Sequence, residues 1–209
     1  MVANQRMIAS DGKEVMLFPL PYMYISQGEN ESYSHAGILA IDFLGYDQNG
    51  RVYNAPMYAP CSCTCVAIID ATNNGRVFVS NDTVHTPLGL QRVTFMCFHD
   101  DNPIAHVGDS FVQGQLFAHT GTAGNVSGDH THFNTASGTY AGWENVPPDN
   151  NGELVNSESV YRICYVNDTV LVNDYNYGWL EYNGSLFPDI KFKGFPWVLY
   201  INRIRDKRT

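Results

Sequence analysis

Short strand-like runs, each bounded by turn signals, are the feature that most constrains how this chain can fold. Across its 209 residues, no stretch of about 12 places apolar side chains at the i, i+3, i+4 and i+7 positions of a helix. β-Branched and aromatic residues recur in runs instead, and turn-forming sequences such as Asn74-Gly75 separate them. The pattern predicts a mainly β fold, an antiparallel β-sheet with few or no long helices, built on the strands Gly37–Phe43, Val66–Ile69, Arg76–Ser80, Arg92–Phe98, Gln115–Ala118 and His130–Ala136.

The pattern changes in the C-terminal part of the chain. Residues 143–158 are polar, with two prolines and an Asn-Asn-Gly sequence, and predict a loop or linker. Val160–Val166 and Thr169–Val172 then predict two strands, and the tail beyond them is rich in Tyr and Trp. We therefore divide the chain into an N-terminal segment (1–19), a main domain (20–142) and a C-terminal extension (143–209) that packs on the main domain or follows it.

The charge balance excludes some partners. The formal net charge is −9 and the pI about 5.0, so the chain has no basic surface for nucleic acid or for an anionic membrane. It contains no apolar run of about 18 residues that would span a membrane. The N-terminus also lacks the basic and apolar segments of a secretory signal peptide. We expect no nucleic-acid partner, no membrane insertion and, for the isolated chain, a monomer.

The five cysteines are an odd number and cannot all pair within one chain. Cys61, Cys63 and Cys65 alternate in a strand-like stretch and share one face, where neighbouring positions have poor disulfide geometry. A zinc thiolate site is conceivable, but the usual two-residue gap and a second cysteine pair are lacking. We expect these cysteines to have a structural or incidental role.

The sharpest chemical feature is His130-Thr131-His132. In a strand, residues i and i+2 project from the same face about 6.5–7 Å apart, so both imidazoles would face one site. One of them can bind a metal ion while the other stands near the metal-bound water. Two surface histidines on an exposed strand are the alternative interpretation.

A second feature is Asp42, which lies between Ile41 and Phe43 and so faces away from their apolar side. A lone carboxylate in an apolar strand is costly unless it binds something. Together with His35, seven residues earlier, it offers zinc a carboxylate and an imidazole. Because seven is an odd spacing, a loop must intervene for both side chains to reach one metal ion.

His99 ends an apolar strand at a polar turn, in the sequence VTFMCFHDDN. It can hydrogen-bond a metal-bound water or a developing oxyanion, or it can be a satisfied, half-buried histidine at a strand end. Neither H-E-x-x-H nor G-x-S-x-G is present, so the protease classes that use those motifs are unsupported.

Taken in order, these residues resemble the motifs of the lysostaphin/LytM-type zinc metallopeptidases, over roughly residues 20–140. Many members of that family place the aspartate where this chain has Leu39. The longer spacing from His35 to Asp42 is similar to the branch found in bacteriophage lysins and tail-associated wall hydrolases. The matching segments are Ser34–Gly37, Ala40–Phe43, Tyr58–Pro60, Phe98–His99, Val107–Asp109, Gly114–Gln115, Gly121–Gly124 and Gly128–Phe133.

The resemblance implies a groove across a mostly antiparallel sheet, with a zinc site in the domain 20–142. It assigns His35, Asp42 and His132 as ligands of one zinc ion per chain, and His99 and His130 as the catalytic residues that act on the water and the transition state. Three protein ligands leave a fourth position open for water, which is typical of catalytic zinc.

Four other residues are placed by the same comparison. Tyr33 is a candidate for stabilising the oxyanion. His85, His106 and His119 fall outside the active positions of the family, and we expect them to be structural or surface residues.

The resemblance thus predicts a zinc-dependent endopeptidase that hydrolyses peptide bonds in the stems or cross-bridges of bacterial peptidoglycan. Without a signal peptide, it would reach the wall outside the cell on a phage particle or through lysis. The alternatives are a bacterial autolysin or bacteriocin-type lysin and, from another class, a non-catalytic wall-binding or structural tail module. Non-catalytic members typically lose one or more ligands, whereas all five positions are filled here.

Overall fold

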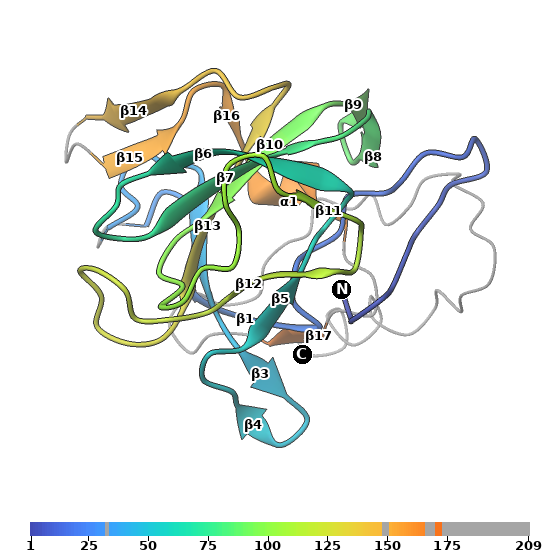
Figure 1. The fold of residues 1–209 in the computed structure, drawn as a ribbon. Helices are drawn as coiled ribbons and strands as arrows, with labels where there is room; N and C mark the ends of the chain where they lie inside the picture. Colours follow the sequence, from blue (N-terminus) through green and yellow to red (C-terminus); the bar gives the residue numbers. More distant parts are fainter. Residues whose placement is uncertain (32–33, 148–150, 166–169, 173–209) are drawn as a thin grey trace, which may run out of the picture.

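The computed structural model describes residues 1–31, 34–147, 151–165 and 170–172, and within them a nine-stranded sheet is the main element (Figure 1). Neighbouring strands along the sheet are antiparallel, except for the parallel pair at its C-terminal edge. The predicted mainly β, antiparallel fold is therefore confirmed. The sheet order is β11 (Ser110–Phe111), β6 (Cys63–Ile69), β7 (Gly75–Ser80), β10 (Val93–Cys97), β13 (Thr131–Ser137), β2 (Ala40–Leu44), β1 (Tyr22–Gln27) and β17 (Val170–Val172), with β16 (Ser157–Glu158) paired to β13.

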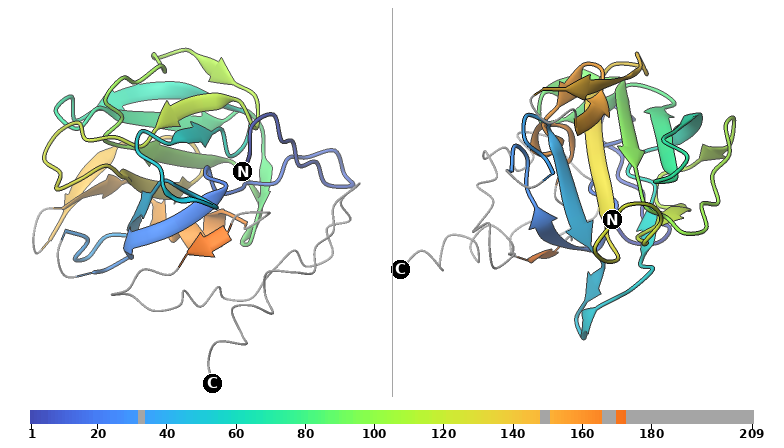
Figure 2. Two further views of the ribbon diagram at one scale, coloured as in Figure 1. Left: turned by 90° about the horizontal axis from the view of Figure 1, so that it is seen from below. Right: turned by 90° about the vertical axis from the view of Figure 1, so that its left-hand side faces the viewer.

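Smaller elements surround this sheet. In the right-hand view of Figure 2, β7, β10, β13 and β2 run side by side as teal, green, yellow and blue strands, and the short hairpins lie at their ends and edges. One short helix, α1 (Val160–Ile163), belongs to the described part of the chain. The two-stranded pairs are β3 (Tyr46–Asp47) with β4 (Gly50–Arg51), β5 (Pro56–Tyr58) with β12 (Leu116–His119), β8 (Val84–Thr86) with β9 (Gly89–Gln91), and β14 (Trp143–Val146) with β15 (Asn151–Leu154).

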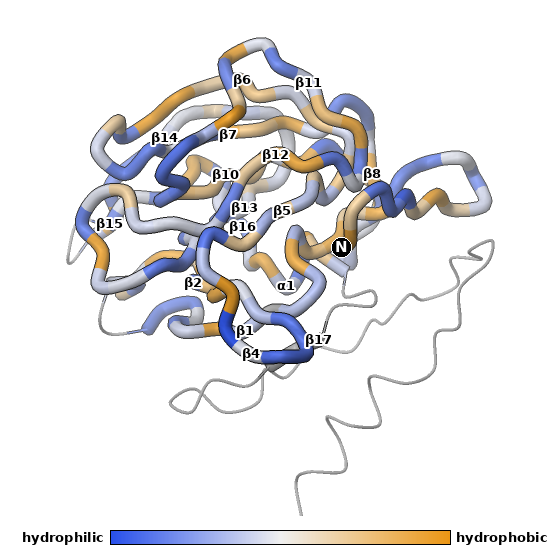
Figure 3. Tube along the Cα trace, turned by 60° about the horizontal axis from the view of Figure 1, so that its bottom comes forward, coloured by the Kyte–Doolittle hydropathy of each residue, from blue (hydrophilic) through white to orange (hydrophobic). Residues whose placement is uncertain are grey.

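Four phenylalanines form the centre of the core. Phe78, Phe95, Phe117 and Phe133 are fully buried, and neighbouring ring centroids lie 5.0 to 6.0 Å apart. Stacked and edge-to-face pairs at this spacing stabilise a core beyond the burial of their area. Hydrophobic stretches, coloured orange, recur along the central strands, whereas the β3–β4 hairpin is largely blue (Figure 3).

Replacing Phe95 with alanine is expected to lower the free energy of unfolding by about 3–5 kcal/mol, because the buried ring packs on Phe78, Phe117 and Phe133 and its loss leaves a cavity. Urea unfolding measured by fluorescence checks this. Leu90→Ala is the control, since that side chain is 49% exposed and its loss should cost about 0.5 kcal/mol or less. Equal effects of the two substitutions would contradict this account of the core.

The loop predicted for residues 143–158 is wrong. These residues form β14, β15 and β16, and the pairing of β16 with β13 joins them to the main sheet. The hairpin is closed by a tertiary contact: Trp143 lies across Gly152, where a Cβ would come within 2.1 Å of the indole. Polar composition indicated a loop, but one aromatic side chain packed on a glycine stabilises a hairpin instead.

The strand predicted for Val160–Val166 is also wrong over its first part, because Val160–Ile163 form α1. Val160 and Ile163 are both fully buried at the i, i+3 spacing of a helix face. The carboxylate of Glu29 accepts a hydrogen bond from Val160 N at 2.8 Å, which caps the helix from a distant segment. β-Branched residues alone indicated a strand, and this tertiary cap favours a helical turn.

The remaining predictions concern strand ends, cysteines, membrane spans and the C-terminal tail. Six predicted strands are present with shifted ends, and the first begins at Ala40 rather than Gly37, whose φ of +82° places it in a turn. All five cysteines are free and buried. No helix among the described residues is long and apolar enough to cross a membrane. Thr169 and the aromatic tail over 173–209 lie outside the described residues.

Candidate metal centre

Three predicted ligands meet at one point. His35 Nε2 lies 3.1 Å from His132 Nδ1 and 3.2 Å from Asp42 Oδ1, and His132 Nδ1 lies 3.1 Å from the same carboxylate oxygen. A tetrahedral zinc ion with bonds of about 2.0–2.1 Å requires ligand atoms roughly 3.3 Å apart. The three atoms therefore form one face of a tetrahedron of the size that zinc needs.

The sheet places two of these ligands opposite each other. In the antiparallel pair of β2 and β13, Asp42 is directly across from His132. Ile41 and Phe43 point into the core from the other face of β2, so strand alternation turns Asp42 outward as the sequence indicated. Cross-strand partners have Cβ atoms about 4.5–5.5 Å apart, which lets an imidazole and a carboxylate converge.

His35 reaches the same point from a turn before β2. Its backbone N donates to Glu31 O, and its carbonyl accepts from Ile38 N, in a bend that Gly37 completes with a φ of +82°. A Cβ at Gly37 would lie 2.9 Å from Pro147 O, so the close approach also requires glycine. The loop required by the odd spacing of His35 and Asp42 is therefore present.

Hydrogen bonds orient the imidazole of His35. Its Nδ1 lies 2.9 Å from Gly28 O, and because a carbonyl only accepts, Nδ1 carries the hydrogen and Nε2 presents a lone pair to Asp42 and His132. Lone pairs and a carboxylate oxygen this close repel one another unless a proton or a metal ion lies between them. The donor set fits zinc, with one carboxylate and two imidazoles.

The titration of these groups reflects their contact. Burial alone would raise the pKa of Asp42, but hydrogen bonds with His132 and His35 hold that pKa well below its usual range. Burial alone would lower the pKa of His35, and the hydrogen bond and charge of Asp42 outweigh this and raise it. Burial lowers the pKa of His132 despite the same carboxylate. Asp42 is therefore an anion with two imidazoles directed at it.

His99 lies beside this centre in a strained backbone. Its φ of +79° is uncommon for a residue other than glycine, and such outliers cluster at functional sites. Its backbone N donates to Asn73 O, and its carbonyl accepts from Ala123 N. Its Nδ1 lies 2.8 Å from Ala123 O and carries the hydrogen, so Nε2 is the free proton acceptor. Burial, with a smaller effect of His130, lowers the pKa of His99 to about 4.

The imidazole of His130, which directly precedes β13, is oriented in the same way as that of His99. Its Nδ1 lies 2.8 Å from Gly128 O, and its Nε2 lies 3.7 Å from Asp42 Oδ2. The rings of His130 and His99 are 4.6 Å apart. Both imidazoles therefore present their Nε2 atoms next to the candidate metal position, where an unprotonated Nε2 can accept a proton.

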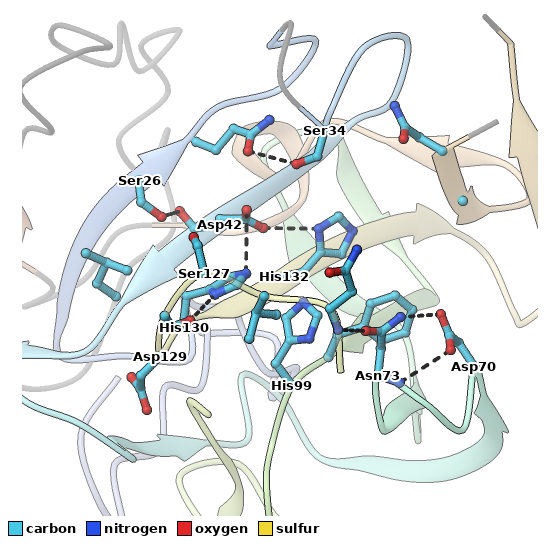
Figure 4. Close-up of a pocket in the computed structure, with 18 of the residues that line it drawn as sticks. Ser26, Ser34, Asp42, Asp70, Asn73, His99, Ser127, Asp129, His130 and His132 are labelled. Atoms are coloured by element: carbon cyan, nitrogen blue, oxygen red, sulfur yellow. Dashed lines mark hydrogen bonds and ion pairs between the residues drawn. The ribbon is translucent and has the colours of Figure 1, made fainter. Parts of the chain in front are cut away.

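Asp42, His99, His130 and His132 line an open groove (Figure 4), whereas His35 is fully buried and does not line it. Asp42 and His132 face each other there, and His130 and His99 follow on the same side of the opening. The sequence did not reveal the walls, which come from segments distant in the chain. They include Ser34, Arg51, Tyr53, Asp70, Asn73, the loop 125–129, and Trp143, Asn145, Asn151 and Gly152 of the β14–β15 hairpin.

The other histidines do not line this groove. His85, His106 and His119 each lie within 2.8 to 3.5 Å of an aspartate oxygen, from Asp11, Asp109 and Asp100 respectively. Tyr33 lies outside the described residues. The structure therefore brings together the five residues singled out as ligands and catalytic groups.

One curated relative that this chain matches is a phage protein. It is 35% identical over 178 residues to Morphogenesis protein 1 of Bacillus phage B103, a match that covers 81% of this chain and 45% of that protein. The chain thus spans less than half the length of this relative. No protein-family model matches the chain.

Solved structures of peptidases are also similar. The catalytic domain of lysostaphin from Staphylococcus simulans is 18% identical, with a TM-score of 0.41 over 55% of this chain and 78% of that chain. A catalytic-domain variant of the prophage-encoded M23 protein EnpA from Enterococcus faecalis is 16% identical, with a TM-score of 0.43 over 64% and 88%. A zinc-containing peptidase from Vibrio cholerae is 17% identical, with a TM-score of 0.40 over 63% and 43%. Because these TM-scores lie below 0.5, any assignment of function to this chain rests on the residues of its own site.

Proposed function

We propose that this chain is a zinc-dependent endopeptidase that hydrolyses peptide bonds in the stems or cross-bridges of bacterial peptidoglycan. The observation that carries the proposal is the convergence of His35, Asp42 and His132 on one point, within 3.2 Å of one another, where Asp42 and His132 line an open groove. Three ligands at an open groove leave a position for water and substrate, as in catalytic zinc sites.

The bound zinc ion would lower the pKa of a water molecule toward 7 and polarise the substrate carbonyl. The residues of the chain supply the proton transfers. The Nε2 atoms of His99 and His130 accept a proton from the attacking water, since both Nδ1 atoms already donate to carbonyls. Once protonated, the same imidazoles stabilise the developing oxyanion and return a proton to the leaving amine.

Arg51 and Asp129 hold the second of these histidines in place. Asp129, next to His130 in sequence, is buried and accepts hydrogen bonds from Thr120 Oγ1 at 2.8 Å and from Asn54 N at 2.8 Å. The guanidinium of Arg51 binds the same carboxylate and the Asp129 carbonyl. This network keeps the imidazole of His130 directed at the groove without requiring bound substrate.

The choice of peptidoglycan and of delivery rests on resemblance. The ordered motifs around the five site residues resemble peptidoglycan endopeptidases, and the curated relative comes from a phage. We therefore propose action on the wall outside the cell, after delivery on a phage particle or through lysis.

Metal removal tests this proposal. We expect about one zinc per chain by elemental analysis, and turbidity loss of purified peptidoglycan that a chelator stops and added zinc restores. Mass spectrometry of the released fragments would then identify the cleaved bond. Stoichiometric zinc without lysis would direct the assay to walls of other species. Neither zinc nor lysis would reject the enzyme and favour a non-catalytic wall-binding or tail module.

A further inference from the structure

His35 differs from the other two candidate ligands because no strand holds it. Asp42 and His132 are fixed by the ladder between β2 and β13, whereas His35 lies in the segment 34–39 that precedes β2. Seven positions separate His35 from Asp42, and the turn between them lies outside the ladder of β2 and β13. The position of His35 therefore depends on contacts between this segment and the rest of the chain.

The β14–β15 hairpin supplies such contacts on the C-terminal side of His35. Leu39 N donates to Glu153 Oε2 at 3.1 Å, and Asn151 Nδ2 donates to Ala36 O at 3.2 Å. Both side chains come from β15 and bind backbone groups that lie between the two ligands. The hairpin thus holds the connection between His35 and Asp42 at two points.

The burial of Glu153 indicates that this contact is specific. Its residue is 9% exposed, whereas Glu144, its direct partner across the hairpin, is exposed. A buried carboxylate is costly unless it accepts hydrogen bonds. The carbonyl of the same Leu39 accepts from Asn134 Nδ2 at 3.0 Å, and Asn134 Oδ1 accepts from Leu154 N at 2.8 Å. The backbone N–H and the backbone carbonyl of Leu39 are therefore both hydrogen-bonded to side chains.

We propose that Glu153 and Asn151 are positioning residues for His35, so that the β14–β15 hairpin sets the zinc affinity of the site. This inference rests on the proposed function. With both contacts in place, the imidazole Nε2 is held where the metal needs it before the metal arrives. Without them, binding must also order the segment, and the affinity falls by that cost.

The test measures the zinc dissociation constant of the full chain by competition with a chromophoric chelator. Removal of a direct hydrogen-bond partner of a metal ligand typically weakens binding about 10–100-fold. Because Glu153 acts on His35 through Leu39, we expect Glu153→Ala to weaken binding about tenfold, at the low end of that range. Glu153→Gln should lose less, because its amide oxygen can still accept from Leu39 N. Asn151→Ala should weaken binding by a smaller factor than Glu153→Ala. Glu144→Ala, at an exposed position of the same hairpin, is the matched control and should bind zinc as the unmodified chain does.

Thermal unfolding of the metal-free proteins separates positioning from general stability. A merely structural role would lower the melting temperature of Glu153→Ala and leave its zinc affinity unchanged, which overturns the inference. If Glu153→Ala does not fold, Asn151→Ala, at a half-buried position, provides the test. A zinc affinity of Asn151→Ala equal to that of the unmodified chain overturns the inference as well. An unmodified chain that binds no zinc rejects the proposed function, and the inference with it.

Discussion

Replacement of His132 by alanine is expected to abolish zinc binding and hydrolysis together. His132 Nδ1 is one of three atoms that define the candidate site, and its loss leaves His35 and Asp42 as an incomplete pair. We expect zinc affinity to fall by more than about 100-fold, beyond the loss typical of an outer partner. Elemental analysis after gel filtration and turbidity loss on peptidoglycan measure the two effects on the same preparation.

His106→Ala is the control for this substitution. The side chain of His106 is 79% exposed and binds Asp109 outside the groove, so its loss should change neither zinc content nor rate. A His132→Ala protein that retained one zinc per chain would show that other residues bind the metal.

Replacement of His99 by alanine is expected to keep zinc and to lower the rate at saturating substrate by about 10²–10³-fold. That loss is typical when one group that stabilises a transition state is removed. His99 contacts His130 but is not one of the three converging atoms, so metal content should be unchanged. The measurement is zinc content together with the hydrolysis rate of purified peptidoglycan fragments over a range of concentrations.

Two further variants show whether a lower rate of His99→Ala comes from loss of the imidazole, from backbone strain or from loss of a buried side chain. Because the φ of His99 is +79°, alanine adds backbone strain, and His99→Asn separates strain from chemistry since Asn tolerates this region. We expect Asn to restore stability and not the rate. His85→Ala, whose side chain is 20% exposed and paired with Asp11, controls for the loss of a half-buried histidine. Full activity of His99→Ala would remove this residue from the mechanism.

The central strands could be predicted because their residues carry the information locally. The run around Phe95 is apolar on both faces, and the corresponding strand is buried throughout. β1 was missed since Tyr22–Gln27 mixes aromatic and polar residues, and its place in the sheet depends on pairing with β2. The hairpin around Trp143 was missed for a similar reason, because its stabilising contact is with a glycine nine residues away.

The residues of the candidate site could be predicted from the sequence, whereas their geometry could not. A carboxylate in an apolar strand and two histidines at i and i+2 each have a physical meaning without a fold, since burial of a charge is costly and strand faces alternate. Which ring nitrogen of each histidine faces the site depends on backbone carbonyls such as Gly28 O and Ala123 O, which no motif specifies.

From the sequence, a β protein could be predicted, and His35, Asp42, His99, His130 and His132 could be singled out as its candidate site residues. Those conclusions follow from local alternation, from the cost of isolated polar groups and from the order of the motifs. The tertiary structure was needed to show that the three candidate ligand atoms lie within 3.2 Å of one another. It was also needed to show that Glu153 accepts a hydrogen bond from Leu39, 114 residues earlier in the chain. Contacts of that range depend on how strands pair and loops bend, and a local pattern contains no information about them.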